Sequence, residues 1–179
     1  MLFWPTDAEH GAERGLPDKA GEPVISTLGN TGESVDIRVA LTEAEIAACF
    51  PALLELRPHL SQQDFVAQVQ RQAKNHGYVL VYIASQGHVV AAAGYRVAEF
   101  LAWGRAFYVD DLITLTASRK FGYGGKLLDW LMEKAKELSC NQFHLDSGVH
   151  RHDAHRLYLS RKLQISSHHF SKELGKSVV

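Results

Sequence analysis

The chain has 179 residues, of which 46% are hydrophobic and 22% charged, and its formal net charge at pH 7 is -1. This length suits one domain with a substantial core, and the near-zero charge argues against general electrostatic attraction to nucleic acid or to an acidic membrane surface. No apolar run approaches the roughly 20 residues of a membrane helix, the first residues MLFWPTDAEHG lack a secretory pattern, and the two cysteines have no metal-ligand or disulfide spacing. We therefore expect a cytoplasmic protein with reduced thiols.

Residues 1–34 differ from the rest of the chain. They hold three of the five prolines, five glycines and scattered charges, without sustained periodicity. This composition predicts a flexible N-terminal leader, followed by a single domain over 35–179.

The domain is predicted to begin with a strand and two helices. Apolar and polar residues alternate over 35–39, as in a strand. A capping-box pattern at Thr42 predicts a helix that ends near Leu56, with a kink or break at Pro51. A second helix is expected to begin at Ser61.

The remaining segments alternate between strand and helix patterns. Strands are predicted over 78–84, 88–97, 106–115, 142–146 and 165–174, and helices over 126–138 and 151–162. The first two of these strands form an antiparallel hairpin. The strands at 106–115 and 142–146 are joined through a helix, so they should be parallel neighbours. The prediction is an α/β layered domain with a mixed sheet.

The stretch SRKFGYGGKLL (118–128) places three glycines between a strand and a helix. It is not a P-loop, because Gly125-Lys126 is followed by Leu127 and not by Ser or Thr, and it lacks the third glycine of a Rossmann turn. Free backbone N–H groups at a helix N-terminus can hold a diphosphate, and glycines let it approach. A plain strand-to-helix turn is the alternative for this segment alone.

The pattern Arg119-x-x-Gly122-x-Gly124 resembles the Gln/Arg-x-x-Gly-x-Gly/Ala signature of the GNAT superfamily of N-acetyltransferases, and the resemblance extends in element order over about 35–174. It implies a mostly antiparallel sheet with flanking helices, in which the parallel strand pair splays apart. It also implies that acetyl-CoA is the co-substrate. Its pyrophosphate would be held by Arg119, Lys120, Phe121, Gly122, Tyr123, Gly124 and Gly125, and its pantetheine arm by Leu112, Ile113 and Thr114.

The same resemblance suggests the catalytic groups. Asp110 lies at the usual position of a general base that acts through water, with Asp111 or a histidine as the alternative. Successive strand residues face opposite sides, so only one of the two acids is expected to face the acceptor. Tyr158 lies in AHRLYLSRK, similar to the family's Asn-x-x-Ala-x-x-x-Tyr helix, whose tyrosine often protonates the leaving thiolate.

Two positions depart from the family pattern. Arg151 replaces the asparagine and is expected to contact the CoA arm, and Lys162 replaces a glycine suited to a left-handed helix end. The basic residues around this helix fit a solvated face or a CoA contact better than a nucleic-acid site. The histidines near 150–155 match a zinc motif poorly, so no metal is expected.

The predicted function is N-acetylation of a primary amine, most simply of a small molecule, with Arg57, His59 and Asp111 as acceptor contacts. A protein or peptide amine is an alternative acceptor. A non-catalytic acyl-CoA-binding regulatory module is the alternative from another class. A homodimer is compatible with the sequence, which does not decide the oligomeric state.

Overall fold

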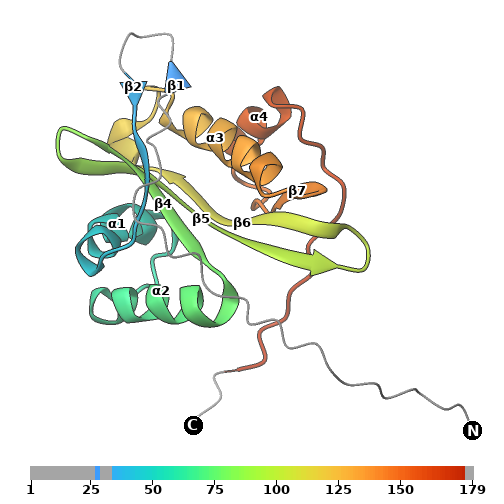
Figure 1. Cartoon of the computed structure of the whole chain (residues 1–179), viewed down its shortest axis with the longest axis horizontal. Helices are drawn as coiled ribbons and strands as arrows, with labels where there is room; N and C mark the ends of the chain where they lie inside the picture. The colour runs from blue at the N-terminus through green and yellow to red at the C-terminus, as the bar shows by residue number, and fades with distance from the viewer. Residues whose placement is uncertain (1–26, 29–33, 176–179) are drawn as a thin grey trace, which may run out of the picture.

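Figure 1 shows the computed structural model of the protein, which describes residues 27–28 and 34–175. Its centre is a five-stranded sheet with the order β3-β4-β5-β6-β7. The strands are β3 (Ile37–Val39), β4 (Val79–Ser85), β5 (His88–Phe100), β6 (Gly104–Thr114) and β7 (Gln142–Leu145). All neighbours are antiparallel except β6 and β7, which are parallel. The predicted mixed, mostly antiparallel sheet is confirmed.

Helices cover both faces of this sheet (Figure 1). Helices α1 (Glu43–Leu56) and α2 (Gln62–His76) lie on one face, and α3 (Tyr123–Glu137) lies on the other, with α4 (His152–Ser160) beside it. A short 3-10 turn, η1 (Thr116–Ser118), leads into the glycine stretch. A small separate pair is formed by β1 (Thr27–Leu28) and β2 (Ser34–Val35).

Two apolar layers hold the helices to the sheet. Leu53 of α1 and Phe65 of α2 are buried against sheet residues that include Ile113. On the opposite face, Leu127 and Leu131 of α3 are fully buried in a second cluster. Burying each such side chain stabilises the fold by about 1.5–3 kcal/mol relative to leaving it exposed. Because the leucines of α3 recur at helical spacing, they all face the sheet, and the layered arrangement buries them together.

Helix α1 begins as predicted and is not broken at Pro51. The Thr42 hydroxyl accepts a hydrogen bond from the Glu45 N–H, and the Glu45 carboxylate accepts one from the Thr42 N–H, which completes the capping box. Pro51 leaves the carbonyl of Ala47 without its helical donor, but both residues are exposed. Because water can satisfy that carbonyl, the helix continues to Leu56.

Two strand predictions need correction. The segment 35–39 is divided between β2 and β3, because β2 pairs with β1 whereas β3 pairs with β4. The final strand predicted over 165–174 is wrong: this segment has no regular structure, and Ile165, Phe170 and Leu174 are exposed. No strand of the described sheet pairs with it. The predicted flexible leader falls mostly outside the described residues.

Candidate active site

Strand β6 contains one extra residue at Asp110. Tyr95 of β5 pairs with Val109, but the next β5 partner, Gly94, pairs with Asp111. Two residues of β6 thus oppose one residue of β5 at this point, which is a β-bulge.

The bulge changes the face to which alternate β6 residues point. Val109 packs in the cluster under α3, whereas Ile113 packs in the cluster under α1 and α2. Asp110 and Asp111 consequently both line one hollow between β6 and the α1–α2 side. The regular alternation expected for these two acids does not hold, because alternation stops at a bulge.

We call this hollow the acid pocket. It has a volume of about 320 Å³. Its floor is apolar and its walls are polar, the main contributors being Leu53, Phe65, Val69, Arg57, His59, Gln68, Tyr78, Asp110 and Asp111. The pocket therefore combines the predicted acceptor contacts from the end of α1 with both acids of β6.

Asp111 is held on both carboxylate oxygens. Arg57 Nε donates to its Oδ1 at 2.9 Å, and the Tyr78 hydroxyl donates to its Oδ2 at 2.8 Å. Burial, and next the Asp111 charge, raise the pKa of Tyr78 well above its ordinary value, so the phenol remains a donor. Arg57 Nη2 also donates to the backbone carbonyl of Asp110 at 2.9 Å. Arg57 thus binds the side chain of Asp111 and the backbone carbonyl of Asp110.

Asp110 is held on one oxygen only. Arg96 Nε donates to its Oδ2 at 2.8 Å, and Arg96 Nη2 contacts the same oxygen. Gln72 accepts a hydrogen bond from Arg96, which helps to fix the guanidinium. Among the described residues, Asp110 Oδ1 has no hydrogen-bond partner. Of the two acids, Asp110 alone therefore keeps an oxygen available for an amine or a water molecule.

A second hollow, the splay groove, lies where β6 and β7 separate. Their last paired residues are Val109 and Leu145, after which β7 ends and β6 continues to Thr114. The groove has a volume of about 100 Å³, and its lining includes Arg57, Asp110, Leu112, Ser147, Arg151 and Tyr158. The edge of β6 that faces the groove carries backbone N–H and C=O groups that β7 does not pair. The predicted splayed parallel pair is confirmed.

Tyr158 faces the splay groove from α4. Burial raises the pKa of its hydroxyl, while the Arg151 charge and then the Ser147 side chain oppose the rise. The phenol is consequently protonated at neutral pH and can donate a proton. The Ser147 hydroxyl is buried near the Tyr158 phenol and affects its pKa, but it makes no hydrogen bond of normal geometry within the described chain. A buried unsatisfied hydroxyl beside a groove is a position where a ligand atom would be favoured.

The glycine stretch provides free backbone N–H groups. Gly122, with φ +81°, precedes α3, and the first helical bond runs from the Lys126 N–H to the Gly122 carbonyl. The N–H groups at positions 123–125 therefore have no acceptor within the helix. Since the positive end of the helix dipole lies at the same place, the stretch fits a bound diphosphate.

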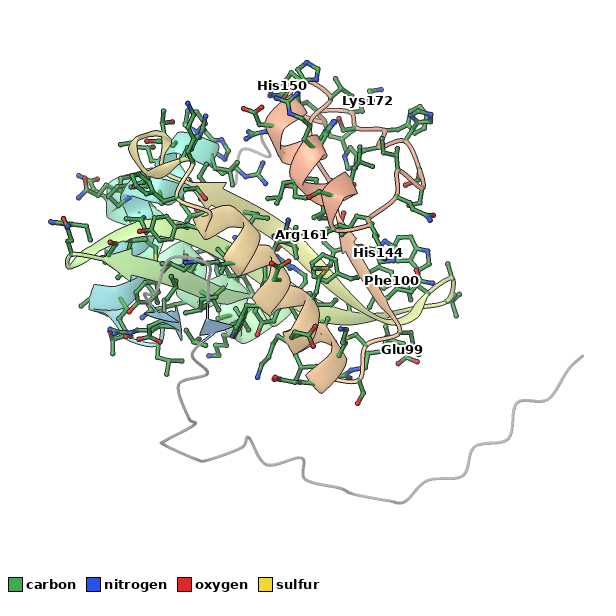
Figure 2. The ribbon with its side chains drawn as sticks, turned by 90° about the horizontal axis from the view of Figure 1, so that it is seen from above. Glu99, Phe100, His144, His150, Arg161 and Lys172 are labelled. Atoms are coloured by element: carbon green, nitrogen blue, oxygen red, sulfur yellow. The ribbon has the colours of Figure 1, made fainter. Side chains whose placement is uncertain are left out.

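Gly124 and Gly125 have a second role, in packing. A Cβ at Gly124 would lie 3.1 Å from Thr114 Oγ1, and one at Gly125 would lie 3.0 Å from Arg161 Nη2. Arg161, labelled in Figure 2, lies at the end of α4. It donates two hydrogen bonds of 2.9 and 3.0 Å to Asp129 of α3. These glycines thus allow α3 to approach both β6 and α4.

The structure brings seven of the sixteen predicted site residues to two adjoining hollows. Both hollows are lined by Arg57 and Asp110. The acid pocket alone is lined by His59 and Asp111. The splay groove alone is lined by Leu112, Arg151 and Tyr158. The glycine stretch lines neither hollow. The side chains of Arg119, Lys120 and Phe121 are exposed, and that of Ile113 is buried in the core.

Sequence reasoning missed Tyr78, Arg96 and Ser147. Arg96 had a usable signal, because it is a single cation near the end of the strongly apolar run HVVAAAGYRV. Such a residue in a central strand needs an anionic neighbour. Tyr78 and Ser147 carry no comparable signal, since their roles depend on contacts with distant parts of the chain.

Over residues 27–28 and 34–175, no group of three or more His, Cys, Asp or Glu side chains is placed to hold a metal ion. In the same part of the chain, no helix combines the length and the apolar character needed to cross a membrane.

Known proteins resemble this chain in sequence and fold. The sequence pattern of the "Acetyltransferase (GNAT) family" matches residues 41–162. The uncharacterized N-acetyltransferase YhdJ of Bacillus subtilis is 26% identical over 139 residues, covering 77% of this chain and 98% of its own. An aminoalkylphosphonate N-acetyltransferase of Salmonella typhimurium is 32% identical over 66 residues, covering 37% of this chain and 43% of its own.

A solved structure has the same fold. AAC(6')-Iy, in complex with a bisubstrate analogue that contains CoA, superposes with a TM-score of 0.68 over 80% of this chain and 100% of its own, at 9% identity. The family match covers more than half of the residues and includes β6, the glycine stretch and α4. This chain therefore belongs to the GNAT family of acetyltransferases.

Proposed function

We propose that this protein transfers the acetyl group of acetyl-CoA directly to the primary amine of a small molecule. The observation that carries this proposal is that Asp110 lines both the acid pocket and the splay groove, in which Tyr158 lies. An amine in the pocket and a thioester in the groove would meet at Asp110. No acyl-enzyme is required, since Cys49 and Cys140 line neither hollow, and burial raises the pKa of the Cys49 thiol to about 12.

Acetyl-CoA is the acetyl donor of this family, and the residues present fit it. The free N–H groups at 123–125 suit its pyrophosphate. The unpaired edge of Leu112, Ile113 and Thr114 suits the amide groups of its pantetheine arm through backbone hydrogen bonds, which explains why the buried side chain of Ile113 is no obstacle. Arg151 and Ser147 lie in the groove beside them.

The reaction forms an amide bond between the acceptor nitrogen and the acetyl carbon and breaks the carbon–sulfur bond. The nitrogen loses one proton, which Asp110 Oδ1 accepts directly or through water, and the departing sulfur gains one proton from Tyr158. Because Arg96 Nε donates to Asp110 Oδ2, Oδ1 is the oxygen that takes part in this proton transfer.

A small acceptor is favoured over a protein amine by the pocket itself. Its volume of about 320 Å³ lies at the lower end of the range of small-molecule sites. The similarity to an aminoalkylphosphonate N-acetyltransferase supports the same class, although it covers less than half of that protein. We also retain a cytoplasmic location as a prediction, because the two cysteines are free thiols.

The test is CoA release from acetyl-CoA across a panel of primary amines, with parallel measurement of the melting temperature in acetyl-CoA. Turnover of at least one small amine, lost in the variant Asp110→Asn with Tyr158→Phe, supports the proposal. Stabilisation by acetyl-CoA without turnover of any amine would favour the non-catalytic acyl-CoA-binding module. Absence of stabilisation at large excess would contradict acetyl-CoA binding itself.

A further inference from the structure

We propose that the acetyl acceptor is a small zwitterion, namely a primary amine that carries a carboxylate or phosphonate a few atoms from the nitrogen, with this anionic group held by Arg57. The inference rests on the proposed acetyl transfer and specifies its substrate class. The inference depends on which charged atoms of the acid pocket lack a partner, on how close these atoms lie to each other, and on the size of the pocket.

The acid pocket does not present two free negative charges. Asp111 is satisfied on both oxygens by Arg57 and Tyr78, and Asp110 is satisfied on Oδ2 by Arg96. The two acids and the two arginines balance in formal charge. A diamine or polyamine would need free carboxylates and would be repelled by the guanidinium of Arg57, so a polycationic acceptor does not fit.

Two residues that line the pocket each keep a charged atom without a partner, and the two charges are of opposite sign. Asp110 Oδ1 and Arg57 Nη1 have no hydrogen-bond partner in the described part of the chain. They belong to neighbouring groups, because Arg57 Nη2 donates to the Asp110 carbonyl at 2.9 Å. The Arg57 side chain is 45% exposed, in contrast to 14% for Asp111. A ligand with an ammonium or amine beside an anion would satisfy both atoms at once.

The rest of the pocket is consistent with an amino-acid-sized molecule. His59 and Gln68 supply further hydrogen-bond donors to the polar wall that contains Arg57. The floor of Leu53, Phe65 and Val69 is apolar and suits an aliphatic or aromatic side chain. The acceptor class that matches all three features is an amino acid or its aminophosphonate analogue with an apolar side chain.

The experiment compares matched amines that differ only in the anionic group. Leucine is paired with isoamylamine and phenylalanine with phenethylamine, and the phosphonate analogues of both amino acids form a third arm. CoA release gives kcat/KM for each, and thermal protection of the CoA-bound protein gives binding without turnover. We expect the anionic member of at least one pair to be favoured by about 10- to 100-fold, the range of one charge-assisted hydrogen-bonded contact.

Variants of the pocket residues test whether Arg57 causes this preference for the anionic amine. The double variant Arg57→Gln with Asp111→Asn keeps the local charge balance and should reduce the preference to less than about threefold. Asp111→Asn alone leaves the cation in place and should keep the preference. Arg71→Gln, an exposed arginine of α2 outside the pocket, is the matched control and should not change the ratio.

The outcomes separate this inference from the proposed function. If neutral amines are acetylated as well as their anionic partners, or if the double variant keeps the preference, the zwitterion inference is wrong while acetyl transfer stands. If acetyl-CoA binds but no amine of either series is acetylated, the zwitterion inference is wrong, and the wider amine panel decides separately whether the proposed acetyl transfer stands. The ratio between carboxylates and phosphonates shows which anion the pocket accepts better.

Discussion

Asp110 and Asp111 are consecutive in β6 and line the same pocket, yet only Asp110 retains a carboxylate oxygen without a partner. The extra residue in the strand explains why both reach the pocket. The different numbers of hydrogen bonds explain why only one of them is suited to take a proton from the acceptor.

This difference predicts unequal effects of removing the two charges. Asp110→Asn should lower kcat by about 10²-fold, within the usual range for a general base. Asp111→Asn should lower it by less than about tenfold, because Asp111 positions Arg57 and does not face the amine with a free oxygen. Steady-state kinetics of the two variants test this, and equal losses would contradict the assignment.

Tyr158→Phe should lower kcat by about 10- to 100-fold at neutral pH while leaving acetyl-CoA binding intact, since the hydroxyl is assigned to protonation of the thiolate. Calorimetric titration with acetyl-CoA provides the binding measurement. Tyr95→Phe is the control, because Tyr95 is a buried tyrosine stacked on Phe107 outside both hollows. A loss of binding equal to the loss of kcat would instead indicate a packing role.

Ser147→Ala should have opposite effects on the free and the bound protein. The hydroxyl is buried without a partner, so its removal should raise the free energy of unfolding of the free protein by about 1 kcal/mol. If a ligand atom completes this hydrogen bond, the stabilisation gained from acetyl-CoA should decrease. Ser160→Ala, which removes a hydroxyl bonded to the Leu157 carbonyl at 2.7 Å, should not affect that gain.

Gly125→Ala should weaken acetyl-CoA binding more than it weakens the fold. The added methyl group would meet the end of the flexible Arg161 side chain, which can move, but it would also add bulk to a residue whose own N–H is one of the free groups. Gly122→Ala is the comparison, because its φ of +81° is unfavourable for alanine and should cost about 1–2 kcal/mol of stability. Unfolding and calorimetric titration separate the two effects.

The buried phenol of Tyr78 predicts a pH dependence of stability. Burial and the Asp111 charge raise its pKa well above the ordinary 10.0. Above pH 10 the unfolded chain loses this proton while the native protein keeps it, so the free energy of unfolding decreases by about 1.4 kcal/mol per pH unit for this group. Below pH 10 both states keep the proton and the contribution is constant.

Urea unfolding at pH values from 8 to 11 measures this slope. Tyr78→Phe should make the slope shallower above pH 10, at the cost of one hydrogen bond to Asp111. An unchanged slope would show that Tyr78 is not the group responsible.

Most of the fold could be predicted because it depends on local signals. Three such signals lie within single segments and were confirmed: the capping box of Thr42, the apolar spacing of Leu127 and Leu131, and the hairpin of β4 and β5. The signature around Gly122 also identified the family correctly.

The site was predictable only in part, because its contacts join distant segments. Arg57 and Asp111 are 54 positions apart, and no periodicity links them. The bulge at Asp110 depends on how β5 and β6 pair, which alternation within one strand cannot reveal. The strand predicted over 165–174 failed for the same reason, since a strand exists only with a partner.

The bulge also determines which changes of length β6 can tolerate. Deleting Asp110 would restore regular pairing with β5 and would leave Asp111 and Ile113 on the face opposite Val109, so both apolar layers would keep their residues. The pocket would lose one of its two carboxylates, whereas a deletion or insertion elsewhere in β6 would turn the following side chains to the opposite face. In a library of variants of this strand, loss of one of the two consecutive aspartates should therefore be compatible with folding and should abolish activity, whereas single-residue insertions and deletions elsewhere in β6 should be eliminated.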